Sequence, residues 1–165
     1  MQKTREKRIK PNIVKKALKD IDVNDPFFDS LKTDYPDYTK WFTKKKKQGA
    51  NAYVTVNEKH ITSLLMIKVE DEKEDYGNFS KEMKKCRRLK IETFKVEDTG
   101  KHIANMFIEI IKDEAMKLKI EEIYITILDK HKELINFLIK EGFYCYCIKN
   151  TNEKVYIKEI KNKNK

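Results

Sequence analysis

The sequence predicts an α/β fold in which helices cover both faces of a mixed, largely antiparallel twisted sheet of about six to seven strands. Apolar residues alternate with period two in some segments and follow a helical period in others. Between residues 89 and 128 a strand pattern, a helix pattern and a second strand pattern follow one another, an order that favours a parallel right-handed crossover. The length of 165 residues and the 39% apolar content predict one domain, residues 25–165, after a basic N-terminal extension, residues 1–24.

Two short helices are expected at the start of this domain. Asp25 and Pro26 are typical of an N-cap and a first helical position, and apolar residues follow at once. A second helix is expected to begin at Pro36, because aromatic residues then repeat at helical spacing. The run Lys44–Lys47 and then Gly49 indicate a solvated last turn and a glycine stop.

The rest of the chain alternates between strand and helix patterns. Strands are expected over residues 52–56, 61–69, 89–96, 121–128, 143–148 and 154–160, and helices over residues 103–118 and 134–139. The stretch 70–85 is charged and lacks either period, so it is expected to be a mobile connection.

The net charge of +10, from 37 Lys and Arg against 27 Asp and Glu, is compatible with a polyanionic partner. However, Lys, Ile and Asn supply 63 residues and Ala, Arg and Gly only 13, a bias typical of an AT-rich genome. Arginine, the usual residue for bidentate phosphate and guanine contacts, occurs four times. We therefore expect only a weak, diffuse association of this basic protein with nucleic acid.

Three cysteines, Cys86, Cys145 and Cys147, and three scattered histidines show no spacing typical of a metal site or a disulfide scaffold. No metal is therefore expected. The sequence also contains no apolar run of the roughly 18 to 20 residues that a spanning helix needs, and no apolar leader at its start. These patterns predict a cytoplasmic protein without a membrane partner, as a monomer or homodimer.

Two local motifs add to the order of elements. Thr93–Val96 leads into Gly100–Ala104, and Leu138–Phe143 joins a helix to a strand through Gly142. Together they resemble the GNAT superfamily of N-acetyltransferases, over most of the chain from about Asp25. The resemblance implies the acyl-CoA N-acyltransferase fold, in which the parallel central pair of strands is splayed, with acetyl-CoA as cosubstrate.

The first motif stands where the family has its Arg/Gln-x-x-Gly-x-Gly/Ala signature. A loop that turns into a helix offers free N–H groups and the positive end of the helix dipole to a pyrophosphate, and Gly100 and Ala104 are small enough for close approach. Thr99 replaces the family's first-position arginine, and His102 replaces its central glycine. The resemblance implies a cofactor site made by Phe94, Lys95, Val96, Thr99, Gly100, Lys101, His102, Ile103 and Ala104.

Direct acetyl transfer requires a neutral amine and protonation of the departing thiolate. By resemblance, Glu92 matches the place where some members keep a general base. The family's usual acid is a tyrosine four residues before the Gly-Phe step, which is Leu138 here. Tyr144 is the candidate acid, with Tyr124 and Tyr146 as other hydroxyls that could approach the thiolate.

Three hypotheses remain open from the sequence. The first is an acetyl-CoA-dependent N-acetyltransferase that acts by direct attack of a primary amine, on a small molecule or a macromolecule. The second is a catalytically degenerate GNAT-like module that binds CoA, nucleic acid or a protein partner. The third is an acetyltransferase for an amine on a nucleic acid or a ribosomal component, toward which the basic ends would steer the protein.

Overall fold

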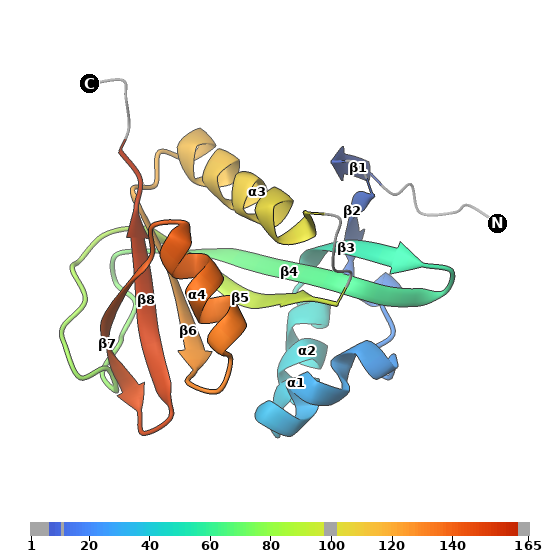
Figure 1. The fold of residues 1–165 in the computed structure, drawn as a ribbon, viewed down its shortest axis with the longest axis horizontal. Coiled ribbons are helices and arrows are strands. Elements are labelled where there is room, and N and C mark those ends of the chain that lie inside the picture. The colour runs from blue at the N-terminus through green and yellow to red at the C-terminus, as the bar shows by residue number, and fades with distance from the viewer. Residues whose placement is uncertain (1–6, 11, 98–101, 162–165) are drawn as a thin grey trace. The chain divides into compact units, whose positions relative to one another are not determined.

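The computed structural model describes residues 7–10, 12–97 and 102–161. The helices are η1 (Leu18–Asp20), η2 (Pro26–Phe28), α1 (Asp29–Asp34), α2 (Tyr38–Lys47), α3 (Ile103–Lys117) and α4 (Lys132–Lys140) (Figure 1). The strands are β1 (Lys7–Lys10), β2 (Ile13–Ala17), β3 (Asn51–Asn57), β4 (His60–Glu70), β5 (Arg88–Val96), β6 (Glu122–Leu128), β7 (Tyr144–Asn150) and β8 (Glu153–Glu159).

All eight strands belong to one mixed sheet with the order β1-β2-β3-β4-β5-β6-β8-β7. The predicted fold class is therefore confirmed, with more strands than expected. The additional strands, β1 and β2, lie within residues 1–24, where only a basic extension is expected from the sequence. β2 pairs antiparallel with β3, and Ile13 and Leu18 are fully buried. Lysines interrupt the apolar alternation of this segment, and so they hide the strand pattern.

The predicted parallel pair consists of β5 and β6 and is short. Its register contains Leu89↔Ile123 and Lys90↔Tyr124, although β5 continues to Val96 and β6 to Leu128. Every residue of β6 has an antiparallel partner on β8 on its other side. The order of strand, helix and strand predicts this parallel pair, because antiparallel neighbours do not need a crossover helix.

The chain divides into two compact units. Unit 1 contains residues 1–66 and 93–107, and unit 2 contains residues 67–92 and 108–165. β4, β5 and α3 each contribute residues to both units.

The core of unit 1 is built by aromatic residues of η2 and α2. Phe28 is fully buried, and its ring lies 5.5 Å from Phe42 and 6.1 Å from Tyr38. The predicted N-cap is confirmed: Asp25 Oδ1 accepts a hydrogen bond from Phe27 N at 3.0 Å. Because its Oδ2 also accepts from Ile61 N at 3.1 Å, the same carboxylate joins this turn to the start of β4.

The connection between β4 and β5, residues 71–87, is anchored on other parts of unit 2. We call this segment the strap, and the expectation that it is mobile is wrong. Ser80 N donates to Ile148 O, and Ile148 N donates to Ser80 Oγ, both at 2.8 Å. Met83 is buried in a cluster with Tyr124 and Cys147. The strap thus satisfies backbone groups on the free edge of β7, the last strand of the sheet. It shields this edge from pairing with other chains.

The three cysteines are free. Strict alternation would point Cys145 and Cys147 in the same direction, but an irregularity in the β7–β8 register falls between them. As a result Cys145 is exposed and Cys147 is buried.

Candidate functional site

The described part of the predicted cofactor site lies at the end of β5 and in the first turn of α3, both in unit 1. Phe94 packs its ring against Phe107 of α3, with centroids 5.5 Å apart and planes at 87°. Ile103 is buried and Ala104 half-buried. Thr99, Gly100 and Lys101 lie outside the described residues. The structure therefore describes the residues of the predicted site that precede and follow this loop.

His102 has a left-handed backbone, with a φ of 55°. Its side chain is exposed, and its carbonyl accepts the hydrogen bond from Met106 N at 3.0 Å that begins α3. Left-handed backbone costs a non-glycine residue about 1–2 kcal/mol, although histidine tolerates it better than most. The position where the family signature has glycine therefore keeps a glycine-like conformation even though a histidine occupies it.

The side chain of Lys95 contacts the segment before α2. Its Nζ donates to Phe27 O and to Ser30 Oγ, the latter at 2.7 Å, and forms an ion pair with Glu97 at 3.0 Å. The ammonium also lies 4.5 Å from the centroid of the Phe27 ring. The Lys95 side chain is therefore engaged by unit 1 itself, and the family resemblance would use only the main chain of this residue.

Thr93 provides a second link between β5 and the helices of unit 1. Its buried hydroxyl lies 3.2 Å from the Tyr38 hydroxyl of α2. Together with Lys95, this contact fixes the segment from Asp25 to Phe42 on the strand that carries the predicted cofactor residues. Two aromatic helices that the sequence predicts are thus attached to the predicted site.

The two catalytic candidates, Glu92 and Tyr144, are not brought together. Glu92 is half-buried on β5, two residues before Phe94. Tyr144 lies on β7, three strands away in the sheet order, which corresponds to about 14 Å at the usual strand spacing. Its side chain is 43% exposed, and its hydroxyl lies 3.3 Å from Glu159 Oε1. Partial burial and the Glu159 carboxylate raise the pKa of the Tyr144 hydroxyl.

The tyrosine beside β5 is Tyr124, which pairs with Lys90 in the parallel register. It is 1% exposed, and its hydroxyl donates to Glu70 Oε1 at 2.5 Å. The same oxygen accepts from Tyr76 at 2.6 Å, and Lys68 lies 3.1 Å from the other oxygen. We call Glu70, Tyr76 and Tyr124 the carboxylate hub.

Hydrogen bonds decide the ionisation of the hub. Burial alone would raise the pKa of Glu70, but hydrogen bonds from Tyr124, Tyr76 and Lys68 outweigh it, so the pKa of this carboxyl lies below its usual value. Burial and the Glu70 carboxylate raise the pKa of Tyr76 to about 12 and that of Tyr124 further. Both tyrosines therefore remain protonated donors at neutral pH. Lys90 lies 5.9 Å from the Tyr124 ring, and burial lowers its pKa.

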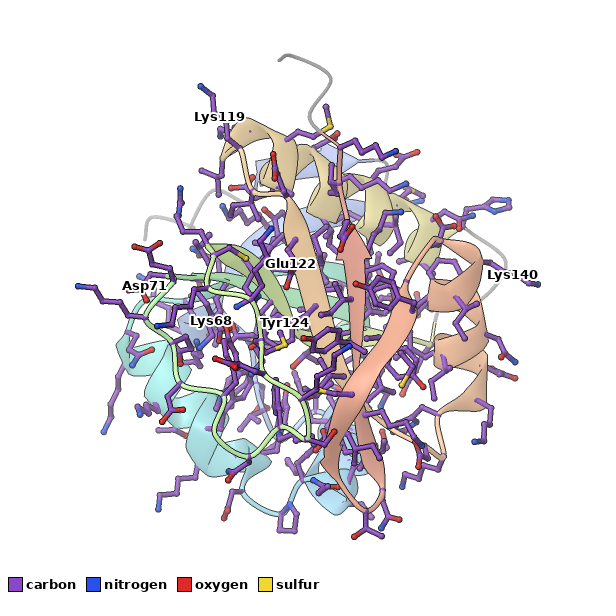
Figure 2. All side chains as sticks on the ribbon, turned by 90° about the vertical axis from the view of Figure 1, so that its left-hand side faces the viewer. Lys68, Asp71, Lys119, Glu122, Tyr124 and Lys140 are labelled. Carbon is purple, nitrogen blue, oxygen red and sulfur yellow. The ribbon has the colours of Figure 1, made fainter. Side chains whose placement is uncertain are left out.

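A buried ion pair lies beside the hub, since Arg88 is 5.1 Å from the centroid of the Tyr76 ring. Its partner is Glu122 of β6, which Figure 2 labels together with Tyr124. Arg88 is 1% exposed, and its Nη2 lies 2.8 Å from Glu122 Oε1, to which its Nε also donates at 3.0 Å. Arg88 Nη2 also donates to Lys84 O of the strap at 2.5 Å. Sequence reasoning did not find the hub or this pair, because their members lie up to 54 positions apart and share no spacing.

Among the described residues, no three His, Cys, Asp or Glu side chains are grouped so that they could hold a metal ion. In the same part of the chain, no helix is both long and apolar enough to cross a membrane. Leu138, which stands at the position of the family's tyrosine acid, is fully buried.

Comparison with known proteins supports the architecture. No protein-family model matches the sequence, and no curated protein matches it. Solved structures do match. NAA60 of Arabidopsis thaliana, bound to a bisubstrate analogue, superposes with a TM-score of 0.58 at 12% identity, over 84% of this chain and 95% of that one. The chain has the GNAT fold.

Two microbial proteins share this GNAT fold. IAA acetyltransferase of Bacillus cereus gives a TM-score of 0.58 at 12% identity, over 90% of this chain and 99% of that one. PaiA N-acetyltransferase of Thermoplasma acidophilum, in complex with coenzyme A, gives 0.54 at 10% identity, over 81% and 76% of the two chains. The predicted architecture is thereby confirmed at the level of the fold.

Proposed function

We propose that this protein is an N-acetyltransferase that moves an acetyl group from acetyl-CoA to a primary amine. The observation that carries the proposal is the left-handed backbone of His102 at the start of α3, because this glycine-like conformation supports a close approach of phosphates to the backbone at this position. The acceptor is a primary amine on a small molecule or a macromolecule.

Residues of unit 1 would bind the cosubstrate. The first turn of α3 leaves N–H groups without helical partners, and these would donate to the pyrophosphate of coenzyme A. Ala104, half-buried in that turn, is small enough for the phosphates to approach the backbone. Main-chain groups of Phe94, Lys95 and Val96 would contact the pantetheine arm, and Thr99, Gly100 and Lys101 would complete the loop.

Acetyl-CoA would supply an activated thioester, and the residues of this chain would manage the protons. An alkyl amine with a pKa of about 10.4 is almost fully protonated at neutral pH and must lose a proton before it attacks. Glu92, half-buried on β5, is the proposed acceptor of that proton, directly or through water. The neutral amine would then form a bond to the acetyl carbon and the C–S bond would break. A hydroxyl would protonate the thiolate, and the proton that the new amide nitrogen loses would restore that hydroxyl.

Two tyrosines are candidates for that hydroxyl. Tyr144 is exposed and near Glu159, whereas Tyr124 lies beside β5 and donates to Glu70. Tyr144→Phe and Tyr124→Phe distinguish them, since each removes one hydroxyl and keeps the ring. The acid is the residue whose variant lowers kcat and leaves the affinity for acetyl-CoA unchanged.

Calorimetric titration with acetyl-CoA and with CoA is the first test, followed by detection of free thiol in the presence of a panel of amines. Glu92→Gln should lower kcat by about 100-fold or more and leave the affinity for acetyl-CoA unchanged, as expected for a lost base. Equal rates for the variant and the wild type would remove Glu92 from the mechanism.

The cofactor site is tested by a matched pair of substitutions in α3. Ala104→Glu places a bulky carboxylate where the phosphates would approach, so CoA binding should be abolished. Asn105→Glu places the same group on the next residue, which is exposed, and should keep most of the affinity. Equal affinities for the two variants would show that the pyrophosphate does not bind at this turn.

A second function is favoured by one observation: Leu138 fills the position of the family's acid and is fully buried. This favours a GNAT-like module that binds CoA without transfer. Micromolar CoA binding without thiol release, over the whole amine panel and between pH 6 and 10, would support this second function.

A further inference from the structure

The net charge of the chain is distributed unevenly. Unit 1 contains 17 Lys and Arg against 10 Asp and Glu, a net charge of +7. Unit 2 contains 20 against 17, a net charge of +3. The two units have similar numbers of basic residues, so the difference comes from the acidic residues, which are fewer in unit 1.

Within unit 1, α2 is the basic helix. It has five lysines and no acidic residue, whereas α1 has one lysine and two aspartates. In α3, two lysines stand against three acidic residues, and α4 has a net charge of +1. The lysine excess of α2 is therefore a property of this helix and not of helices in this protein generally.

Three of these lysines lie on one side of α2. Lys40, Lys44 and Lys47 follow the i, i+4, i+7 spacing that aligns side chains along a helix, and all three are exposed. We call them the lysine face. None of their side chains makes an ion pair with any residue that the structure describes. Their charges are therefore available to a partner.

The opposite side of α2 fixes this face in place. Tyr38 and Phe42 are 6% and 1% exposed and pack into the aromatic core of unit 1. The adjacent cleft of about 390 Å³ is lined by Lys19 and Lys46 but also by Asp20 and Asp22, which would repel an anion. The helix face, and not the cleft, is thus the surface suited to negative charge.

We propose that the lysine face binds the phosphate backbone of a nucleic acid without reading its sequence. From Lys40 to Lys47 the helix rises about 10 Å, a length over which one nucleic-acid strand carries about three phosphates. Lysine ammonium groups act as point charges, which suit phosphates, while sequence reading usually relies on arginine, asparagine or glutamine at base edges. This inference does not depend on acetyl transfer.

An anionic membrane is a less suitable partner. Helices that lie on a membrane surface insert an apolar side into it. In α2 the apolar residues Tyr38 and Phe42 are buried inside unit 1, and Trp41 is half-buried against the same cluster. Charge alone would then have to hold the protein on a lipid surface, whereas nucleic acid binding needs no apolar contact.

Fluorescence anisotropy of the full chain tests the proposal, with labelled single-stranded RNA and duplex DNA as the two probes, titrated between about 50 and 200 mM salt. The triple variant K40Q/K44Q/K47Q should weaken binding and lower the slope of log K against log salt by about 2 for single strands and about 3 for duplex. The probe that binds more tightly shows whether the lysine face prefers single-stranded RNA or duplex DNA.

The matched control removes the same charge from unit 2. Lys117, Lys132 and Lys140 are exposed on α3 and α4, and Figure 2 shows Lys140 pointing away from the body of unit 2. The variant K117Q/K132Q/K140Q should keep the wild-type slope. Lys44 and Lys47 lie in the last turn of α2, where a positive charge stabilises the helix through its dipole, so the triple variant also destabilises the helix. K40Q alone is therefore the second variant, because Lys40 lies outside that turn. It should lower the single-strand slope by about 0.7.

Several outcomes would overturn the proposal. Equal losses in the two triple variants would show that the attraction comes from diffuse charge. Equally tight binding of polyglutamate, or of phosphatidylserine vesicles, would assign the surface to another class of partner. Absence of binding to either nucleic acid at the lowest salt would also refute it, whatever the protein does with acetyl-CoA.

Discussion

Each unit contains one covering segment that differs in kind from that of the other. Unit 1 uses the helical segment from Asp25 to Lys47, whose aromatic rings pack on one another in an apolar cluster. Unit 2 uses the strap, which has no regular secondary structure and is fixed by the carboxylate hub and the Arg88–Glu122 pair. The difference shows that a segment rich in charge can be anchored without helices when its polar groups find buried partners.

The largest effect is expected in unit 1, from Phe28→Ala. The side chain is fully buried among Phe27, Tyr38 and Phe42, so its removal leaves a cavity that rigid neighbours cannot fill. The free energy of unfolding should fall by about 4 kcal/mol, as measured by urea denaturation. Phe28→Leu is the control and should cost less than half as much. A loss below about 1 kcal/mol for the alanine variant would mean that the aromatic cluster does not hold unit 1 together.

In unit 2, Arg88→Met should cost about 3 kcal/mol in urea denaturation, because it leaves the buried Glu122 carboxylate without its partner. The double variant Arg88→Met with Glu122→Leu should recover most of this loss, since an apolar pair of similar volume replaces both charges. If the double variant is as unstable as the single one, the two side chains stabilise unit 2 through their packing and not through compensation of their charges.

Tyr76→Phe tests the attachment of the strap itself. It removes one hydrogen bond to the Glu70 carboxylate and should lower the free energy of unfolding by about 1–2 kcal/mol. Amide hydrogen exchange of residues 71–87 should accelerate more than exchange in α4. Tyr146→Phe, whose hydroxyl donates to the backbone oxygen of Glu82, is the matched control and should have a smaller effect. Uniform acceleration over unit 2 would contradict a local role for Tyr76.

The smallest effect concerns pH. The pKa of Glu70 is lowered in the folded protein, so its carboxylate stabilises the fold above the unfolded value of about 4.3. That contribution is lost as the pH falls through the lower folded pKa. Glu70→Gln should therefore reduce the dependence of stability on pH below about 4.3 and leave its slope unchanged between pH 6 and 8. An unchanged acid limb in urea unfolding would show that Glu70 is not stabilised as a carboxylate.

The sequence predicts the helical segment Asp25–Lys47 of unit 1 better than the strap of unit 2 for a physical reason. Helix caps and aromatic repeats act between residues three or four apart, so Asp25, Pro26 and Gly49 identify the ends of the helical segments directly. The strap has no such repeat, and its partners on β4, β6 and β7 come from distant parts of the chain. Charged residues therefore predict a mobile loop where the structure has an anchored one.

In the candidate site, too, contacts between neighbours in the chain are predicted from the sequence and contacts between distant residues are not. The motif predicts β5, the following loop and the first turn of α3 as neighbours, because they are consecutive in the chain. Sequence reasoning also names Glu92 and Tyr144 together, yet the sheet order places their strands three positions apart. It gives no reason to prefer Tyr124, which becomes a neighbour of β5 only through the parallel pairing.

By itself, the sequence determined the class of fold and the aromatic helices, since these depend on local periodicity and capping preferences. Only the tertiary structure decided that residues 7–17 join the sheet, that the strap is fixed, and that Glu70 meets two tyrosines. Those features depend on strand order and on burial, which bring together groups that no short-range pattern connects.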